Sequence, residues 1–269
     1  MIFSALAILI ASISLSSCKK KYPTDTTAAE DDANASITMQ DTKNILDAAV
    51  NGHVIAQCAT ITKRDTNSGI DSLLDINFGP ADCTGAPDKR ARRGQILVWY
   101  LPGTYFNQGS IINMAFKNYF LSDIGVAGAA TITNTGVDSA NIHSWSYNAN
   151  LTLSYPSSNA TWNSQRSCAL VKVGGIFYYS ITGSANGRSR SSATYTLNIT
   201  SPVYATAVPY PIGCQYFEAG QISFTVSTFS YSERSSSFSM NSVFGTSVGS
   251  CGNTAQATIS GSQYPFNQP

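Results

Sequence analysis

Charged residues are scarce in this sequence. Lysine, arginine, aspartate and glutamate together make up 12% of the 269 residues, and the formal net charge is +1. So weak a charge gives no electrostatic attraction for nucleic acid, and we expect no nucleic-acid partner. Residues that favour helices are also scarce, whereas β-branched and aromatic residues are plentiful. This composition is typical of exported β proteins.

Residues that could hold a metal or drive catalysis are few. The chain has two histidines, His53 and His143, and none of its six cysteines belongs to a Cys-x-x-Cys pair. A zinc or iron–sulfur site is therefore poorly supported, and we expect no metal and no cofactor. We interpret His53 as a residue at a helix end and His143 as an exposed strand residue rather than as catalytic bases. The sequence thus favours a protein that is not an enzyme.

The sequence begins with an apolar run that is too short to span a membrane. Residues 2–15 fall short of the roughly 20 apolar residues that a helix needs to cross a bilayer. The run ends in Leu15-Ser16-Ser17-Cys18, which resembles the lipobox of bacterial lipoprotein signal peptides, although no Lys or Arg precedes it. We therefore predict that residues 1–17 are a lipoprotein signal peptide. Cys18 would then carry the lipid, and membrane lipid would be the partner through this anchor.

The rest of the chain divides into three parts. Residues 18–32 are polar and lack apolar periodicity, which predicts a flexible tether. Residues 33–57 carry apolar residues at helical spacing, with Gly52 as a stop signal, and predict a helix. Residues 58–269 alternate between apolar and polar positions, as in 151–155 and 222–226, and predict a single β-rich domain. The predicted fold class is all-β, mainly an antiparallel meander arranged as a sandwich or a strongly curled sheet, with a short N-terminal helix.

Two parts of the β region echo each other around cysteines. In both, a strand ends in Phe-Gly, a small polar loop follows, and a cysteine precedes the next strand (Cys83 and Cys251). An earlier cysteine, Cys58 or Cys214, starts the preceding strand in each. We therefore predict the disulfides Cys58–Cys83 and Cys214–Cys251, each stabilising the fold by roughly 3–4 kcal/mol. Cys168 is left over, and we interpret it as a buried thiol.

One long segment resembles a known family. Its motifs are Ile76-Asn77-Phe78-Gly79, Asp82-Cys83-Thr84-Gly85, Pro87-Asp88-Lys89-Arg90-Ala91-Arg92-Arg93-Gly94-Gln95-Ile96, Pro102-Gly103-Thr104-Tyr105, Phe116-Lys117-Asn118-Tyr119-Phe120 and Thr131-Ile132-Thr133-Asn134-Thr135-Gly136. In these motifs the chain is similar to a family of lipoproteins from Bacteroidetes bacteria. The likeness covers most of residues 58–259. It implies β structure and a place in the cell envelope as an outer-membrane lipoprotein, but it implies no activity.

The same resemblance bears on orientation and modification. Surface-exported lipoproteins of this group commonly carry acidic residues directly after the lipid cysteine, whereas Lys19, Lys20 and Lys21 follow Cys18 here. This difference favours the periplasmic face of the outer membrane over the cell surface. The triplets Asp71-Ser72-Leu73 and Asp138-Ser139-Ala140 look like the O-glycosylation acceptors of these bacteria.

Two features of the β region suggest binding surfaces. The residues Lys89, Arg90, Arg92 and Arg93 form the densest charge in the chain and could bind an anionic ligand, although a solvated loop at the start of a strand explains them as well. Trp145 and Trp162 could line a sugar-binding face or fill the core.

Two functions remain open from the sequence. The first is a membrane-anchored envelope lipoprotein with a non-catalytic binding or structural role, whose partner is a glycan or an envelope protein. The alternative is a glycan-binding or glycan-hydrolysing envelope protein. Hydrolysis would need two carboxylates across the scissile bond, and most acidic residues of the β region stand in turn-like sequences instead.

Overall fold

The computed structural model describes one helix and thirteen strands. The described residues are 25–53, 56–65, 72–84, 90–101, 103–137, 143–207, 216–229, 235–244 and 251–268. The helix is α1 (Thr27–Val50). The strands are β1 (Thr60–Asp65), β2 (Ser72–Cys83), β3 (Arg92–Tyr100), β4 (Ile111–Leu121), β5 (Ile124–Val137), β6 (His143–Ser154), β7 (Asn159–Val173), β8 (Ile176–Arg188), β9 (Thr194–Thr206), β10 (Phe217–Phe229), β11 (Ser235–Phe244), β12 (Thr254–Ile259) and β13 (Ser262–Asn267).

The thirteen strands form one sheet. Their spatial order is their sequence order, and each strand pairs antiparallel with the next. Alternate residues point to opposite faces, so Leu151 and Leu153 of β6 and Phe224 of β10 are buried on one face while their neighbours are polar. The predicted all-β meander is confirmed, and the curled sheet is the arrangement that forms.

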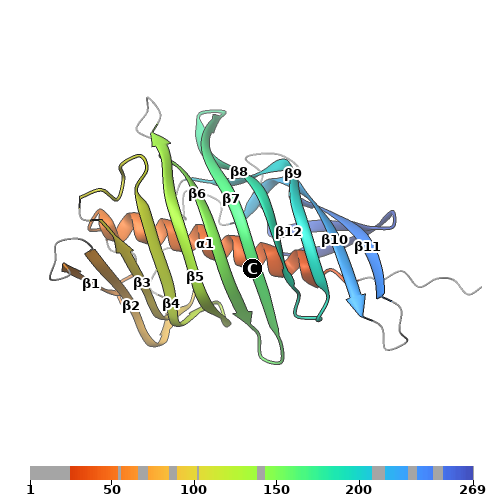
Figure 1. The fold of residues 1–269 in the computed structure, drawn as a ribbon, viewed down its shortest axis with the longest axis horizontal. Helices are drawn as coiled ribbons and strands as arrows, with labels where there is room; N and C mark the ends of the chain where they lie inside the picture. Colours follow the sequence, from red (N-terminus) through yellow and green to blue (C-terminus); the bar gives the residue numbers. More distant parts are fainter. Residues whose placement is uncertain are drawn as a thin grey trace, which may run out of the picture.

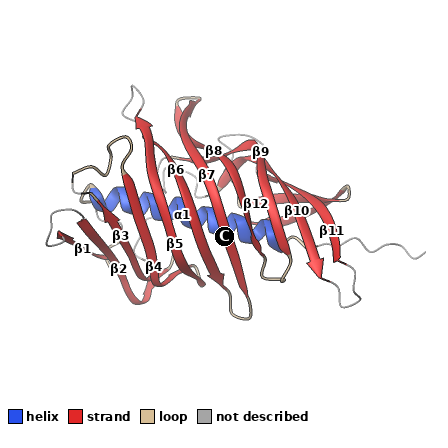
Figure 2. Ribbon diagram, in the orientation of Figure 1, coloured by secondary structure: helices blue, strands red, loops and turns tan. Residues whose placement is uncertain are grey.

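The sheet curls around α1. Figure 1 shows the helix crossing behind the middle strands, and Figure 2 shows the same arrangement with the helix in blue and the strands in red. α1 contacts β6, β7 and also β10. Every residue from 31 to 43 is buried, which requires cover on all sides of the helix because 13 consecutive residues occupy every face. The helix is therefore the centre of the core.

Glycines allow two of the middle strands to bend. Gly128 in β5 and Gly183 in β8 have φ angles of +111° and +125°. A Cβ atom on either would lie 2.1 or 2.2 Å from a backbone oxygen of the neighbouring strand, that of Asn150 or Gln165. Only glycine fits such a conformation and such a close approach. These two positions therefore help the sheet to wrap around the helix.

The helix differs from its predicted range. It was expected at residues 33–57 but spans Thr27–Val50, so residues 27–32, predicted as tether, are helical. Asp31 and Asp32 look like tether residues because they are charged, yet both are buried. Asp32 is paired with Arg166 of β7, and Asp31 is paired with Arg190 in the loop between β8 and β9. The tether prediction is wrong for this part, because partners distant in the sequence draw the polar residues into the core.

The cysteines follow the predicted pattern where they are described. Cys58 and Cys83 form a disulfide with a Cα–Cα distance of 5.8 Å, which confirms that pairing. Cys168 is a buried free thiol, and burial raises its pKa to about 12. Cys251 is disulfide-bonded, and its predicted partner Cys214 lies outside the described residues, so the second pairing stays a prediction.

Candidate functional site

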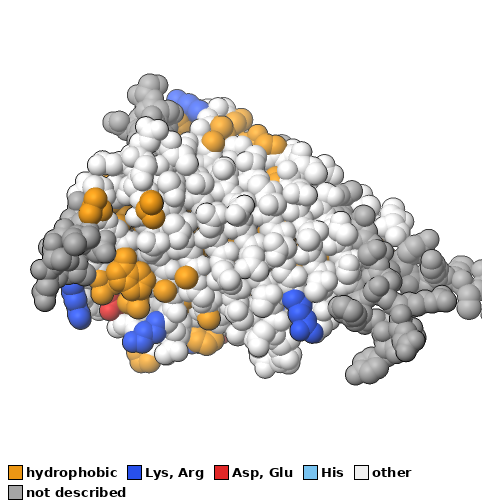
Figure 3. Space-filling view, in the orientation of Figure 1, with side chains coloured by type: hydrophobic (Ala, Val, Ile, Leu, Met, Phe, Trp, Pro, Cys, Tyr) orange, Lys and Arg blue, Asp and Glu red, His pale blue; other side chains and the backbone are white. Residues whose placement is uncertain are grey.

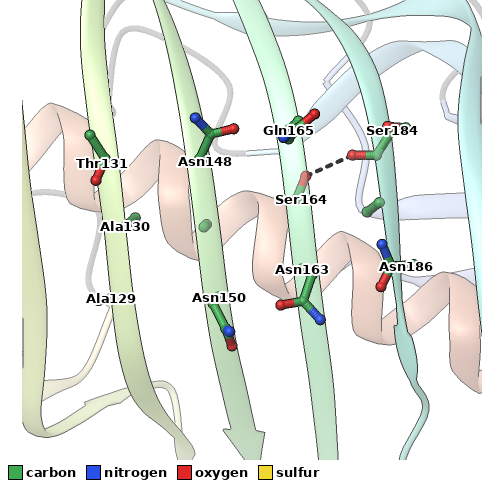
Figure 4. Close-up of a pocket in the computed structure, with 12 residues that line it drawn as sticks. Ala129, Ala130, Thr131, Asn148, Asn150, Asn163, Ser164, Gln165, Ser184 and Asn186 are labelled. Atoms are coloured by element: carbon green, nitrogen blue, oxygen red, sulfur yellow. Dashed lines mark hydrogen bonds between the residues drawn. The ribbon is translucent and has the colours of Figure 1, made fainter.

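A hollow of about 460 Å³ lies on the sheet face that points away from α1. Figure 4 shows its residues along the strands β5 to β8, with the helix behind the strands. The lining residues are Ala129, Ala130, Thr131, Asn148, Ala149, Asn150, Asn163, Ser164, Gln165, Ser184, Ala185 and Asn186. None of these twelve side chains is charged or aromatic, so the hollow presents amides and hydroxyls on a floor of small residues.

The strand register places the polar side chains of the hollow in rows. Asn148 lies opposite Thr131 on one side and Gln165 on the other, and Gln165 lies opposite Ser184. Neighbouring members of a row are about 4.8 Å apart, because that is the spacing between strands. Each amide can both donate and accept hydrogen bonds. The hollow therefore offers regularly spaced donors and acceptors without charge.

One of these rows continues beyond the hollow on both sides. We call it the outer polar row; it consists of Asn113, Thr131, Asn148, Gln165, Ser184 and Asn198. The Thr131 hydroxyl donates to the Asn113 side chain at 2.8 Å. Figure 3 shows that the middle of this face carries few charged or hydrophobic side chains, while hydrophobic ones gather over the strands near β3.

The third tryptophan, Trp99, lies at one end of the outer polar row. It is half-buried on the outer face of β3 and lies opposite Asn113 of β4. Trp145 and Trp162, by contrast, are each 1% exposed. Of the two interpretations of those residues, the place in the core is confirmed and the sugar-binding face is not, because both point inward and contact α1. The half-exposed indole of Trp99, which lies beside polar side chains, can instead stack on the apolar face of a ligand.

Behind the hollow, the inner face of β7 is fixed to α1 by a buried ion pair. The Arg166 guanidinium donates to Asp32 at 2.5 Å and to the Ser36 hydroxyl at 2.7 Å. The Trp162 indole N–H donates to the same Asp32 carboxylate at 2.7 Å. Burial alone would lower the pKa of Arg166, but the charge and hydrogen bond of Asp32 together with nearby Tyr147 and Cys168 outweigh burial and raise that pKa. These contacts hold β7 in place, so Asn163 and Gln165 on its other face have a rigid support.

The three described arginines of the basic run lie beside carboxylates of the protein itself. Arg92 is 2% exposed and donates to both Asp41 oxygens, at 2.5 and 3.1 Å. Arg90 lies 3.6 Å from the same carboxylate, and Arg93 pairs with Asp82 at 2.7 Å. Lys89 lies outside the described residues. Both expectations for Arg92, an anionic-ligand site and a solvated loop, are wrong because its partner on α1 is far away in the sequence.

The remaining predicted sites are settled only in part. Cys18 and the triplet Asp138-Ser139-Ala140 lie outside the described residues. Ser72 is fully buried, so it is no acceptor for O-glycosylation in the folded protein. No cluster of three or more potential metal-binding side chains occurs among the described residues. Among the described residues, no helix is both long enough and apolar enough to cross a membrane.

A serine motif in the chain does not indicate a hydrolase. Residues 245–249 read Gly-Thr-Ser-Val-Gly, which has the Gly-x-Ser-x-Gly spacing of a nucleophile elbow. Such an elbow joins a strand to a helix, whereas these residues lie outside the described part of the chain and join the antiparallel strands β11 and β12. The strand context therefore differs from that of an α/β-hydrolase.

The sequence contains a signal for the features that were missed. Arg166 stands at an inward position of β7, in alternation with Trp162 and Cys168. A charged residue on the buried side of a strand implies a buried partner of opposite charge. The alternation of β3 likewise assigns Trp99 to the face opposite Val98 and Tyr100. Neither signal identifies the partner, because the partners lie on α1 or on other strands.

Comparisons with known proteins give no further assignment: no protein-family model, no curated protein and no solved structure matches the chain.

Proposed function

We propose that this protein is a non-catalytic, envelope-anchored lipoprotein that binds a neutral glycan on the outer face of β5 to β8. The observation that carries the proposal is the hollow of about 460 Å³, whose twelve lining residues are all uncharged. Sugars without acidic groups present many hydroxyls that both donate and accept hydrogen bonds. Side-chain amides and hydroxyls match this pattern without the desolvation penalty that a charged side chain brings.

The shape of the site also fits a chain-like ligand. The outer polar row repeats at the strand spacing and extends from the hollow towards Trp99 on β3. A glycan lying across the strands would meet an amide or hydroxyl at each step and the indole face at one end. The Trp99 ring would then stack on the apolar face of a sugar ring.

A binding role agrees better with the hollow than a catalytic one. General acid–base chemistry needs a carboxylate, histidine or similar group within hydrogen-bond reach of the substrate. The lining of the hollow contains no such group. We therefore infer that the glycan is held and not cleaved there.

The anchor remains part of the proposal through Cys18. The Asp25 carboxylate already accepts a hydrogen bond from the Ser191 hydroxyl at 2.5 Å, so the folded domain extends to this residue. Six residues lie between Cys18 and Asp25, and the seven steps from one to the other allow a reach of about 25 Å at full extension. A lipid on Cys18 would thus hold the domain close to the membrane surface.

Glycan binding is tested with two variants in the hollow and one matched control. A neutral-glycan array selects the probe, and calorimetry measures its affinity for the wild type, Asn148→Ala, Gln165→Ala and Asn159→Ala. Asn159 is an exposed asparagine at the start of β7, the strand of Gln165, and it lies outside the hollow. We expect about tenfold weaker binding for each hollow variant and no change for the control. No binding of any neutral glycan, or equal affinities for all variants, would refute the proposal.

Anchoring is tested separately with Cys18→Ala. Cells are labelled with a lipid precursor and then fractionated. We expect the wild-type protein to carry the label and to appear in the detergent-extracted membrane fraction, and we expect the variant to carry no label. Labelled variant, or unlabelled wild type in the soluble fraction, would remove the anchor from the proposal.

A further inference from the structure

A second cavity lies on the inner side of the sheet, at the C-terminal end of α1. Its volume is about 410 Å³, within the range of about 300–1,000 Å³ that is usual for small-molecule sites. It is lined by Ala49, Val50, Ile61, Lys63, Leu74, Tyr100, Gly103, Tyr105, Phe106 and Asn107. Most of these side chains are apolar or aromatic, in contrast to the hollow on the outer face.

The aromatic wall of this cavity is fixed in place. The Tyr105 ring contacts Tyr100 and Phe106 edge-on, with centroid distances of 5.3 and 4.7 Å. The Tyr105 hydroxyl donates to Asp47 at 2.9 Å, and Asp47 also pairs with Lys43 at 2.6 Å. The Tyr105 hydroxyl and the Asp47 carboxylate therefore have partners already. The wall presents ring surfaces to the cavity.

At the C-terminal end of α1, the backbone carbonyls of Ala48 and Ala49 already accept hydrogen bonds, so they do not need a partner in the cavity. The carbonyl of Ala48 accepts from the backbone N–H of His53 at 2.8 Å, and that of Ala49 accepts from Gly52 at 3.2 Å. Their negative partial charge is thus engaged, as at an ordinary helix C-terminus. Apolar Ala49 and Val50 remain to line this side of the cavity.

Among the described residues that line the cavity, Lys63 alone is charged. It lies on β1 opposite Leu74, whose side chain is buried on the inner face, so Lys63 also belongs to the inner side of the sheet. The side chain is exposed, and no described carboxylate lies within ion-pair distance of it. An unpaired cation thus stands beside an apolar, aromatic space.

The position of β1 in the sheet explains why Lys63 is charged, but it does not explain the cavity. β1 is the first strand of the sheet, and an inward-pointing lysine on such a strand protects it from pairing with other chains. That role accounts for the charge but does not account for the unfilled apolar volume beside it. An apolar ligand in this space would remove the apolar lining from water, which is favourable.

We propose that this cavity binds a small apolar carboxylic acid. The tail of the acid lies against Tyr105 and Phe106, and its carboxylate pairs with Lys63 at the mouth. Charge complementarity selects an acid over an alcohol or an amine, and the apolar lining selects a hydrocarbon tail. The site is independent of the glycan-binding hollow, because the two lie on opposite faces of the sheet.

Three probes of equal tail length separate charge from hydrophobic burial. The purified full chain in detergent-free buffer is titrated with octanoate, octan-1-ol and octylamine, and binding is measured by calorimetry. The variants are Lys63→Gln, which removes the charge, and Ile61→Trp, which fills the cavity. Arg64→Gln is the matched control, because Arg64 is the next exposed cation on β1 but does not line the cavity.

The expected order of affinity is octanoate, then octan-1-ol, then octylamine. Lys63→Gln should weaken octanoate binding about tenfold and leave octan-1-ol unchanged. Ile61→Trp should abolish binding of both, and Arg64→Gln should change neither. Equal binding of octanoate and octylamine, equal effects of Lys63→Gln and Arg64→Gln, or no saturable binding of octanoate would overturn the proposal.

Discussion

Two buried carboxylates on α1 are paired with arginines of the sheet. Asp32 accepts hydrogen bonds from Arg166 and Trp162, and Asp41 accepts two from Arg92. An unpaired charge in such an interior would be very unfavourable, so each pair fixes the position of the helix relative to one strand. The pairs explain how a polar helix can fill the centre of a β protein.

Arg166→Met should destabilise the protein by about 3–5 kcal/mol, because it leaves Asp32 buried without its cation. Arg93→Met is the matched control, since the Arg93–Asp82 pair is partly exposed and should contribute less than about 1 kcal/mol. Urea unfolding of both variants measures the difference. Equal losses of stability would show that the buried pair has no special role.

Asp31 makes stability depend on pH. Burial, together with the charges of Asp25 and Asp32, raises its pKa from 3.8 to about 6, although hydrogen bonds from Arg190 and Tyr155 act against this. The folded protein therefore holds this proton more tightly than the unfolded chain does. The contribution of Asp31 to stability is complete below about pH 4 and is lost as the pH rises through about 6.

The Asp31→Asn variant isolates this contribution. We expect the free energy of unfolding of the wild type to fall, relative to that of Asp31→Asn, between pH 4 and pH 7. Urea titrations at four or five pH values measure the difference, in which the other titrating groups cancel. A difference that is flat or that rises with pH would contradict the raised pKa of Asp31.

At the scale of elements, bent strands are what allow the sheet to enclose the helix. Gly128 tests this, because a Cβ atom there would lie 2.1 Å from the Asn150 oxygen. Gly128→Ala should therefore destabilise the protein by about 2 kcal/mol or more. Gly136→Ala in the same strand is the control, since the nearest atom is 3.9 Å away and the expected change is within about 0.5 kcal/mol. Thermal unfolding that shows equal shifts for both would mean that β5 tolerates a side chain at the bend.

α1 could not stand alone as an element. It is polar over much of its length, and 18 of its 24 residues are buried by the sheet. Isolated helices of this kind are only marginally stable in water, and tertiary packing supplies most of their stability. The helix therefore depends on the strands, as the strands depend on it for cover.

At the scale of the whole molecule, one continuous core joins the two ends of the sheet. The buried apolar cluster includes residues of α1 and of strands from β2 to β13. Arg92 of β3 and Arg166 of β7 bind the same helix. Loss of the helix would uncover both halves together, so the domain should unfold as one unit.

Denaturant unfolding should therefore show a single transition. Tryptophan fluorescence reports on β3, β6 and β7 through Trp99, Trp145 and Trp162, and far-ultraviolet circular dichroism reports on the whole sheet. We expect coincident midpoints by both methods. Two separated transitions would show that the halves of the sheet fold independently.

The strands and one disulfide could be predicted from the sequence, because their signals are local. Alternation such as that of residues 151–155 and 222–226 specifies which side of each strand is buried, whatever lies against it. The pairing of Cys58 with Cys83 spans 25 residues and joins the turn before β1 to the end of β2. Both predictions rest on short segments and are confirmed.

Only the tertiary structure decided where the helix lies and what the polar residues do. Asp32 and Arg166 are 134 residues apart, and the hollow combines four strands whose outward side chains show no local pattern of binding. The sequence assigned Asp32 to a tether and Arg92 to a surface because a charge favours water unless a partner is known. The curl of the sheet supplies those partners, and it also shapes the cavity at Lys63 and the uncharged hollow on the outer face.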